Sequence, residues 1–142
     1  MKAEFNNSNG WAAIGIVRDT YNIPENVHPN DYPHCNHMVS YGMDSFGMWY
    51  GKVHYQGHGT SGNISYKNNQ IVKLEFDSEK GTLIFFVDGV QQPVYVAGIN
   101  ENVRFFISLQ FAQSSCTIRS LKRLRESSTT NVPNEKAVQW QS

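Results

Sequence analysis

The sequence predicts an all-β protein in which two antiparallel sheets pack into a sandwich with little helix. Aromatic residues make up 13% of the 142 residues, and 11 glycines separate short apolar runs. Aromatic and β-branched residues favour strands, and clusters of Gly, Asn and Ser favour turns. Residues 71–76 alternate, with Val72, Leu74 and Phe76 on one face. A period of two is typical of a strand with one buried face.

The most distinctive local motif is GTLIFFVDG at residues 81–89. Gly81 ends the polar turn DSEKG, where a backbone with positive φ suits glycine. The pair Asp88–Gly89 is a strong signal for a tight turn between two strands. We therefore predict a strand over residues 82–87, held between two turns and paired with the strand that precedes it.

Further strands are predicted on both sides of this hairpin. The run WAAIGIV at residues 11–17 fits a buried strand, and Gly15 within it indicates that another backbone or a large ring lies close. Residues 38–55 read as two or three short strands broken by glycines. Residues 103–111 and 116–121 are predicted to form another antiparallel pair.

Two segments lack this strand pattern. Residues 18–37 contain three prolines and many Asn and Asp residues, which predicts a long loop without helix or strand. Loops of this length within a compact domain are often functional. We expect residues 1–121 to form one domain and residues 122–142 a C-terminal extension that docks through residues 136–140, with Trp140 covering the sandwich.

Charge and composition narrow the range of partners. Lys plus Arg and Asp plus Glu number 12 each, so the formal net charge is zero. A neutral domain has no long-range attraction for nucleic acid or for an anionic membrane, and we expect neither as a partner. The N-terminal residues MKAEFNNSNG lack the apolar core of a secretory signal. We expect a cytoplasmic protein in which Cys35 and Cys116 are free thiols.

The motifs in their order resemble the SPRY domain, a β-sandwich that recognises other proteins. The matching phrases are Ile14-Gly15-Ile16, the loop at 18–37, YGMDSFGMWYG, the alternating strand ending at Asp77, GTLIFFVDG, and VRFFISL at 103–109. The resemblance covers roughly residues 10–121, and GTLIFFVDG is its most specific part. It implies an all-β, concanavalin-like sandwich acting as a non-catalytic interaction module, for example as an adaptor.

One part of the sequence departs from the SPRY pattern. Members of that family usually carry one or more strands before the I-G-(I/V) strand, whereas this chain has only MKAEF there. The N-terminal edge strand is therefore expected to be short or missing. Residues 136–140 could fill the resulting edge, and a second copy of the chain could fill it in a homodimer, because an open edge promotes association.

The residues do not favour catalysis. His34, Cys35 and His37 are three potential metal ligands within four residues, but zinc sites normally take spaced pairs of ligands from two segments. A metal-dependent hydrolase built on this cluster is therefore a minor hypothesis, and we expect no metal and no cofactor. Asp77 and Asp88 are accounted for as turn residues.

Binding through loops at one end of the sandwich is the favoured function. Carried over from the SPRY resemblance, the recognition face joins the loop after the I-G-(I/V) strand to the residues just past the late strand. Tyr21 and Phe111 are its expected aromatic anchors, although both rings could instead be structural. The alternative is a carbohydrate-binding, lectin-like domain, because aromatic and Asn/Asp-rich loops can also hold sugars. The predicted ligand-binding residues are Asp19, Thr20, Tyr21, Tyr32, Phe111 and Gln113.

Overall fold

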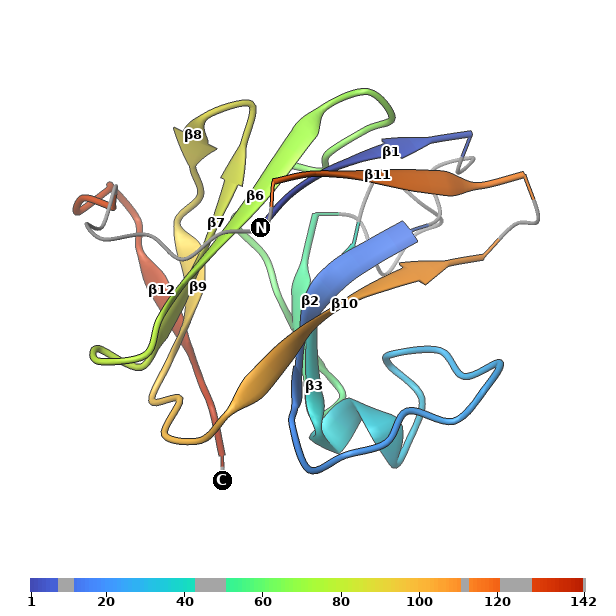
Figure 1. Ribbon diagram of the computed structural model, residues 1–142. Helices are drawn as coiled ribbons and strands as arrows, with labels where there is room; N and C mark the ends of the chain where they lie inside the picture. The colour runs from blue at the N-terminus through green and yellow to red at the C-terminus, as the bar shows by residue number, and fades with distance from the viewer. Residues whose placement is uncertain (8–11, 43–50, 111–112, 121–128, 142) are drawn as a thin grey trace.

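Two β-sheets packed face to face make up the protein (Figure 1). The computed structural model describes residues 1–7, 12–42, 51–110, 113–120 and 129–141. Within these residues all strand pairs but one are antiparallel, and the helical content is a 3-10 turn at His34–Asn36. The predicted two-sheet antiparallel sandwich with little helix is confirmed. No helix of the described residues is long and apolar enough to cross a membrane.

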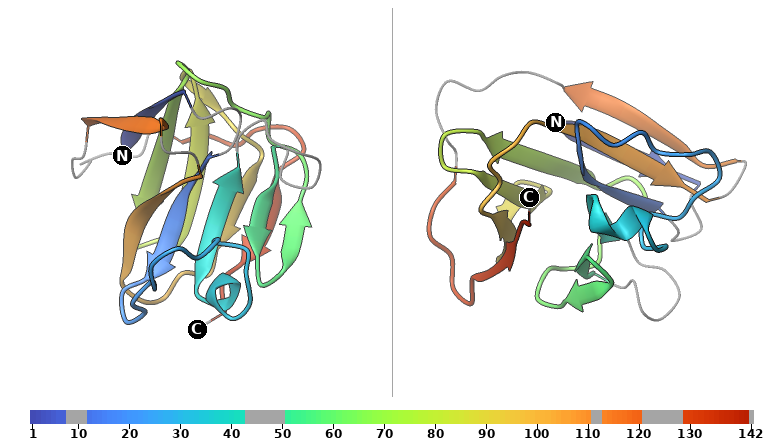
Figure 2. Two further views of the ribbon diagram at one scale, coloured as in Figure 1. Left: turned by 90° about the vertical axis from the view of Figure 1, so that its right-hand side faces the viewer. Right: turned by 90° about the horizontal axis from the view of Figure 1, so that it is seen from below.

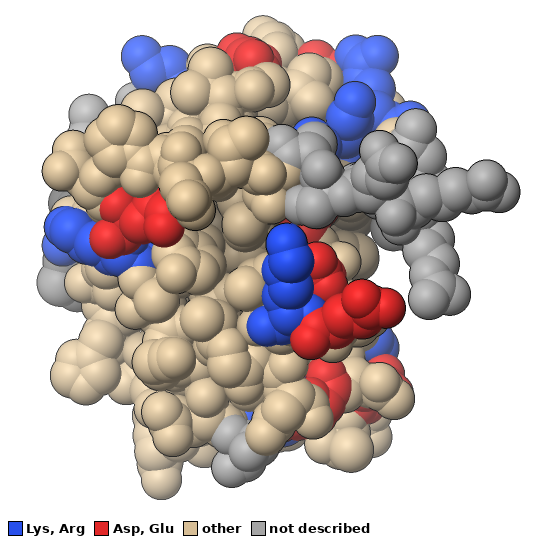
Figure 3. Space-filling view, turned by 90° about the vertical axis from the view of Figure 1, so that its left-hand side faces the viewer, with Lys and Arg blue, Asp and Glu red and all other residues tan. Residues whose placement is uncertain are grey.

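The larger sheet has seven strands among the described residues. Its order is β11-β1-β6-β7-β9-β12, and β8 lies beside β7. The strands are β1 (Lys2–Asn6), β6 (Ile71–Asp77), β7 (Thr82–Val87), β8 (Val90–Gln91), β9 (Val94–Ala97), β11 (Ser115–Ser120) and β12 (Lys136–Gln139). On the face shown in Figure 3, the basic and acidic residues drawn in colour are interspersed, so these residues form no extended patch of one sign.

The smaller sheet has five strands within the described ranges, in the order β10-β2-β3-β4-β5. They are β2 (Ala12–Arg18), β3 (Met38–Gly42), β4 (Val53–Tyr55), β5 (His58–Thr60) and β10 (Val103–Leu109). β10 therefore lies at one end of this sheet, next to β2, as the left view of Figure 2 shows. This position matters for the site because, among the described residues, β10 pairs with β2 alone.

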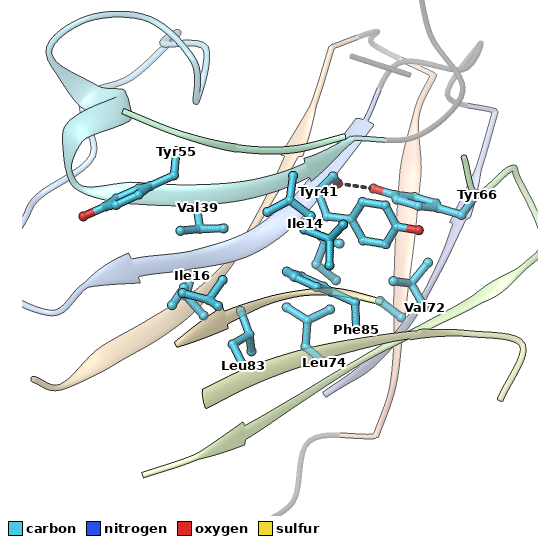
Figure 4. Packing of buried hydrophobic residues seen from close by; sticks show 14 of the residues in the cluster. Ile14, Ile16, Val39, Tyr41, Tyr55, Tyr66, Val72, Leu74, Leu83 and Phe85 are labelled. Atoms are coloured by element: carbon cyan, nitrogen blue, oxygen red, sulfur yellow. Dashed lines mark hydrogen bonds between the residues drawn. The ribbon is translucent and has the colours of Figure 1, made fainter. Parts of the chain in front are cut away.

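The core lies between the two sheets and is filled by alternate side chains of their strands. Ile14 and Tyr41 of the smaller sheet point toward Leu74 and Phe85 of the larger one (Figure 4), and all four side chains are almost fully buried. The Tyr66 hydroxyl donates a hydrogen bond of 2.8 Å to the backbone oxygen of Tyr41, so this buried polar group has a partner.

The hairpin around GTLIFFVDG forms as predicted. β6 and β7 pair from Val72–Val87 to Asp77–Thr82, and the turn between them has Gly81 at φ 68°. The Asp77 carboxylate accepts two turn N–H groups at 3.0 Å, as expected of a turn residue. The tight turn at 88–89 then reverses the chain into β8.

Gly15 is required by the close approach of its neighbours. A Cβ at this position would lie 1.8 Å from the Val39 carbonyl oxygen and 3.1 Å from a ring carbon of Phe106. Both the backbone and the ring predicted near Gly15 are therefore present. Phe106 is the cross-strand partner of Gly15 in the β2–β10 ladder, and its ring packs over this glycine on the outer side of the smaller sheet.

Two expectations about strand pairing were wrong or need refinement. Residues 103–111 and 116–121 do not form a pair, because β10 lies beside β2 and β11 beside β1, in different sheets. The chain crosses from the smaller sheet to the larger one between these two strands. The residues MKAEF also form a strand: β1 is short but lies inside its sheet, with β11 on one side and β6 on the other. Both sides of β1 are therefore paired with strands of the same chain.

The C-terminal segment joins the opposite end of the larger sheet. β12 pairs in parallel with β9, from Lys136–Val94 to Gln139–Ala97. Trp140 follows with only 5% of its surface exposed and stacks on Tyr55, with ring centroids 5.4 Å apart. Its indole N–H donates to a Glu101 carboxylate oxygen at 3.1 Å. This ring therefore closes the space between the ends of the two sheets.

Candidate functional site

The loop over residues 18–37 lies against one end of the outer face of the smaller sheet (Figure 2). Ser40 lies between two core residues of β3, so its side chain points away from the core, yet it is buried. Its hydroxyl donates to the Asn30 side-chain oxygen at 2.9 Å, and the backbone N–H of Gln56 donates to the Cys35 oxygen at 3.1 Å. The loop is therefore fastened to the sheet rather than free in solvent.

The base of the loop is held by two ion pairs. The Arg18 guanidinium contacts both Glu101 carboxylate oxygens at 3.0 and 3.1 Å, and also donates to the Asn36 backbone oxygen at 3.4 Å. Asp19 pairs with Arg104 at 3.5 Å, and its backbone N–H donates to Asn102 at 2.9 Å. These contacts join the start of the loop, its end and the beginning of β10 into one support.

Tyr21 fixes the shape of the loop from within. Its ring stacks on His37, with centroids 4.1 Å apart and planes 13° from parallel, and its hydroxyl shares a hydrogen bond with His34 Nδ1. Burial, followed by the nearby Arg18 charge, lowers the pKa of His37, which keeps this imidazole neutral near pH 7. One ring face and the hydroxyl of Tyr21 are thus already engaged, so we assign it a positioning role.

The His34, Cys35 and His37 cluster does not converge. Cys35 is buried and a free thiol, His34 contacts Tyr21 through its Nδ1, and His37 stacks on the same ring. Across the described ranges, no three His, Cys, Asp or Glu side chains come together as metal ligands. The 3-10 turn at these residues was not predicted; it forms because the N–H groups of Asn36 and His37 bond back to residues 33 and 34.

A hollow lies between this loop and the end of β10. Its volume is about 550 Å³, within the range of roughly 300–1,000 Å³ that is usual for ligand sites. It is open on one side, and its walls are mixed in polarity. The loop contributes Asn26, Val27, His28 and Asp31, and the end of β10 contributes Ser108, Leu109 and Gln110. Segments about 80 residues apart in the sequence therefore build one surface.

The hollow is lined mainly by polar residues, with two apolar residues and one carboxylate among them. Leu109 is 40% exposed and Val27 is half-buried, so both offer apolar surface. One Asp31 carboxylate oxygen accepts the backbone N–H of His28 at 3.3 Å. Burial lowers the pKa of His28 although the Asp31 charge acts in the opposite direction, so the imidazole is neutral at pH 7. Its Nδ1 accepts the Asn30 N–H at 3.2 Å, which places the imidazole proton on Nε2.

The predicted site residues fall into three groups. Thr20, Tyr32 and Gln113 are exposed, Tyr32 to 82%. Asp19 and Tyr21 are engaged in the loop support described above. Phe111 lies outside the described residues.

The loop and the end of β10 lie together at this hollow. The second half of the expected recognition face lies just past β10, and its Phe111 and Ala112 are outside the described residues. The residues that line their hollow were not singled out from the sequence. Leu109 and Gln110 directly precede Phe111, and Val27 lies inside the loop, so their positions in these two segments were the available signal.

No family model matches the sequence, and no curated protein matches it.

Proposed function

We propose that this chain is a non-catalytic, SPRY-type protein-interaction module that binds an extended peptide segment of another protein. The hollow between the loop and the end of β10 carries the proposal. Its loop wall belongs to the segment in which the SPRY resemblance implies a recognition face, and its other wall directly precedes Phe111. Hydrogen bonds from the loop to the smaller sheet and the β2–β10 ladder hold the two walls. The same reasoning favours a cytoplasmic adaptor or a substrate-recognition part of a larger assembly.

The edge of β10 suits the backbone of such a peptide. Asp19 N–H donates to the Asn102 oxygen, and the pairing runs from Arg18–Val103 to Ala12–Leu109. In an antiparallel ladder, alternate residues direct their N–H and C=O groups to opposite sides. The backbone groups of residues 103, 105, 107 and 109 therefore point away from β2. An added strand can bond to them, while one of its side chains enters the hollow.

Leu109 is the wall residue best suited to a test. Its partly exposed side chain would be covered by a bound peptide, and full burial of a leucine contributes about 1.5–3 kcal/mol. Ile118 on β11 is a matched control, because it is an exposed branched aliphatic residue on the other sheet. We expect Leu109→Glu to weaken binding by at least about tenfold and Ile118→Glu to leave it within twofold.

The experiment starts from a displayed library of random 12-residue peptides. Peptides selected on the wild-type protein are synthesised, and their dissociation constants are measured by fluorescence polarisation against both variants. Thermal melts establish that all three proteins are equally folded. If both variants lose the same amount of peptide affinity, or if Leu109→Glu loses none, the peptide binds elsewhere on the protein. Selection of no peptide, together with saturable binding of free oligosaccharides, would favour the lectin-like alternative.

A further inference from the structure

We infer that the hollow selects an arginine side chain of the bound peptide, with Asp31 as its counter-ion. The inference rests on the proposed function and adds the chemistry of the ligand. Residues 22–33 contain Glu25 and Asp31 but no Lys or Arg. His28 is neutral, and among the described residues the end of β10 contributes Ser108, Leu109 and Gln110 to the hollow, none of which is charged. A peptide cation approaching this hollow therefore meets net negative charge.

The basic residues at the base of the loop do not neutralise this charge. Arg18 is paired with Glu101 and Arg104 with Asp19. Within the described ranges, Asp31 has no ion pair with a Lys or Arg of the chain. Among the described residues, one oxygen of the Asp31 carboxylate accepts a hydrogen bond from the His28 backbone N–H at 3.3 Å. A carboxylate offers about four acceptor positions, so most of the capacity of Asp31 is available to a ligand.

The shape of the hollow suits a side chain with an apolar stem and a charged end. Val27 and Leu109 provide apolar contact for the methylene groups, which long cationic side chains commonly bury. Asp31 provides the charge, and the amide oxygens of Asn26 and Gln110 are further acceptors. Lysine has the same kind of stem but ends in a compact ammonium group. Arginine has five donors in a planar fork, so it is the better match for several acceptors around one hollow.

A positional peptide library tests this inference. The probes are nonapeptides, acetylated and amidated at their ends, with one fixed residue at each position in turn and mixtures elsewhere. They are measured against the wild-type protein, Asp31→Asn and Glu25→Gln. Asp31→Asn removes the charge but keeps an oxygen that can accept the His28 N–H. Glu25→Gln makes the same charge change in the same loop at an exposed residue that does not line the hollow.

We expect arginine at one position to raise wild-type binding by at least about tenfold over norleucine, because a hydrogen bond to a charged group contributes a factor of this size. Lysine at that position should bind several-fold more weakly than arginine. Asp31→Asn should abolish the arginine preference, and Glu25→Gln should retain it to within about threefold.

The contrary results separate this inference from the proposed function. Peptide binding without a basic preference, or a preference that survives in Asp31→Asn, overturns the inference and leaves the interaction module intact. An equal loss in Glu25→Gln would also overturn it, because general loop charge would then be responsible. Equal binding of lysine overturns the choice of arginine. A folded wild-type protein that binds no peptide in either library overturns both proposals.

Discussion

Replacement of Trp140 by alanine tests how firmly the C-terminal segment is docked. The ring is 5% exposed, stacks on Tyr55 with planes 8° from parallel, and donates to Glu101 at 3.1 Å. The Arg18 guanidinium also lies over it, 5.0 Å from the ring centroid. Removing a buried Trp side chain typically costs about 3–5 kcal/mol. Glu101 keeps its ion pair with Arg18, so no isolated charge adds to this cost.

For a domain of this size, such a loss corresponds to a fall in Tm of roughly 10–20 °C. Native domains have free energies of unfolding of about 5–15 kcal/mol, so the variant should remain folded at low temperature but with a much smaller margin. Trp140→Phe separates the contributions, because it retains the stack on Tyr55 and loses the hydrogen bond to Glu101. We expect it to cost about 1–2 kcal/mol.

Urea unfolding followed by far-ultraviolet circular dichroism measures these differences. Gln139→Ala is the matched control, since Gln139 is the last residue of β12, directly before Trp140, and its side chain is exposed. It should change the free energy of unfolding by less than about 0.5 kcal/mol. A Trp140→Ala variant within 1 kcal/mol of the wild type would refute the reasoning, because the ring could not then be part of the folded core.

Two further predictions concern the smaller sheet. Gly15→Ala should lower the free energy of unfolding in urea by about 3 kcal/mol or more, because its Cβ would clash with the Val39 carbonyl oxygen. Gly57→Ala is the control: its Cβ meets no atom within 4 Å, so it should cost only about 1 kcal/mol for its positive φ. Similar losses of stability in the two variants would contradict the clash. Burial lowers the pKa of His54 from its usual 6.5 to about 4, so the unfolded chain binds its proton first and stability should fall as pH drops from about 6.5 to 4. His54→Gln should flatten the dependence of the urea midpoint on pH in this window, and an unchanged slope would show that other groups cause it.

Local signals account for the parts of the fold that the sequence predicted well. The alternation in residues 71–76 and the turn residues around 82–87 define β6 and β7 because each signal lies within a few residues. The structure places Gly81, Asp88 and Gly89 at φ values of 68°, 48° and 82°, as turns of this kind require. Strand existence and turn position are local properties, so the sequence reports them directly.

Strand partners depend on distant residues and were predicted less well. The β10–β11 pairing was wrong because proximity in sequence does not reveal that the chain changes sheets between them. β1 was overlooked because five residues give only two alternating apolar positions, Ala3 and Phe5. Both are fully buried in the core, where β1 is held between β6 and β11.

For the site as well, the sequence predicted the segments that build it but not the contacts and exposure of their side chains. The loop at 18–37 could be recognised from its prolines and its polar residues, and the late strand from its apolar pattern. The sequence did not decide whether Tyr21 is a binding anchor or a structural residue, because its contacts with His34 and His37 depend on the path of the loop. The exposure of Val27 and Leu109 likewise depends on how the loop crosses the sheet, so neither could be singled out in advance.

The place of β1 in its sheet has a consequence for the rate of folding. Lys2 pairs with Ser120 and Asn6 with Ser115, so this ladder joins residues more than 100 positions apart. Closing such a loop costs conformational entropy before any bond in the ladder forms. Sandwiches dominated by distant pairings fold in about milliseconds to seconds, whereas helical domains of similar stability fold in about microseconds to milliseconds. The local hairpin β6–β7 can form early, but the sheet that contains it closes only after β11 has reached β1.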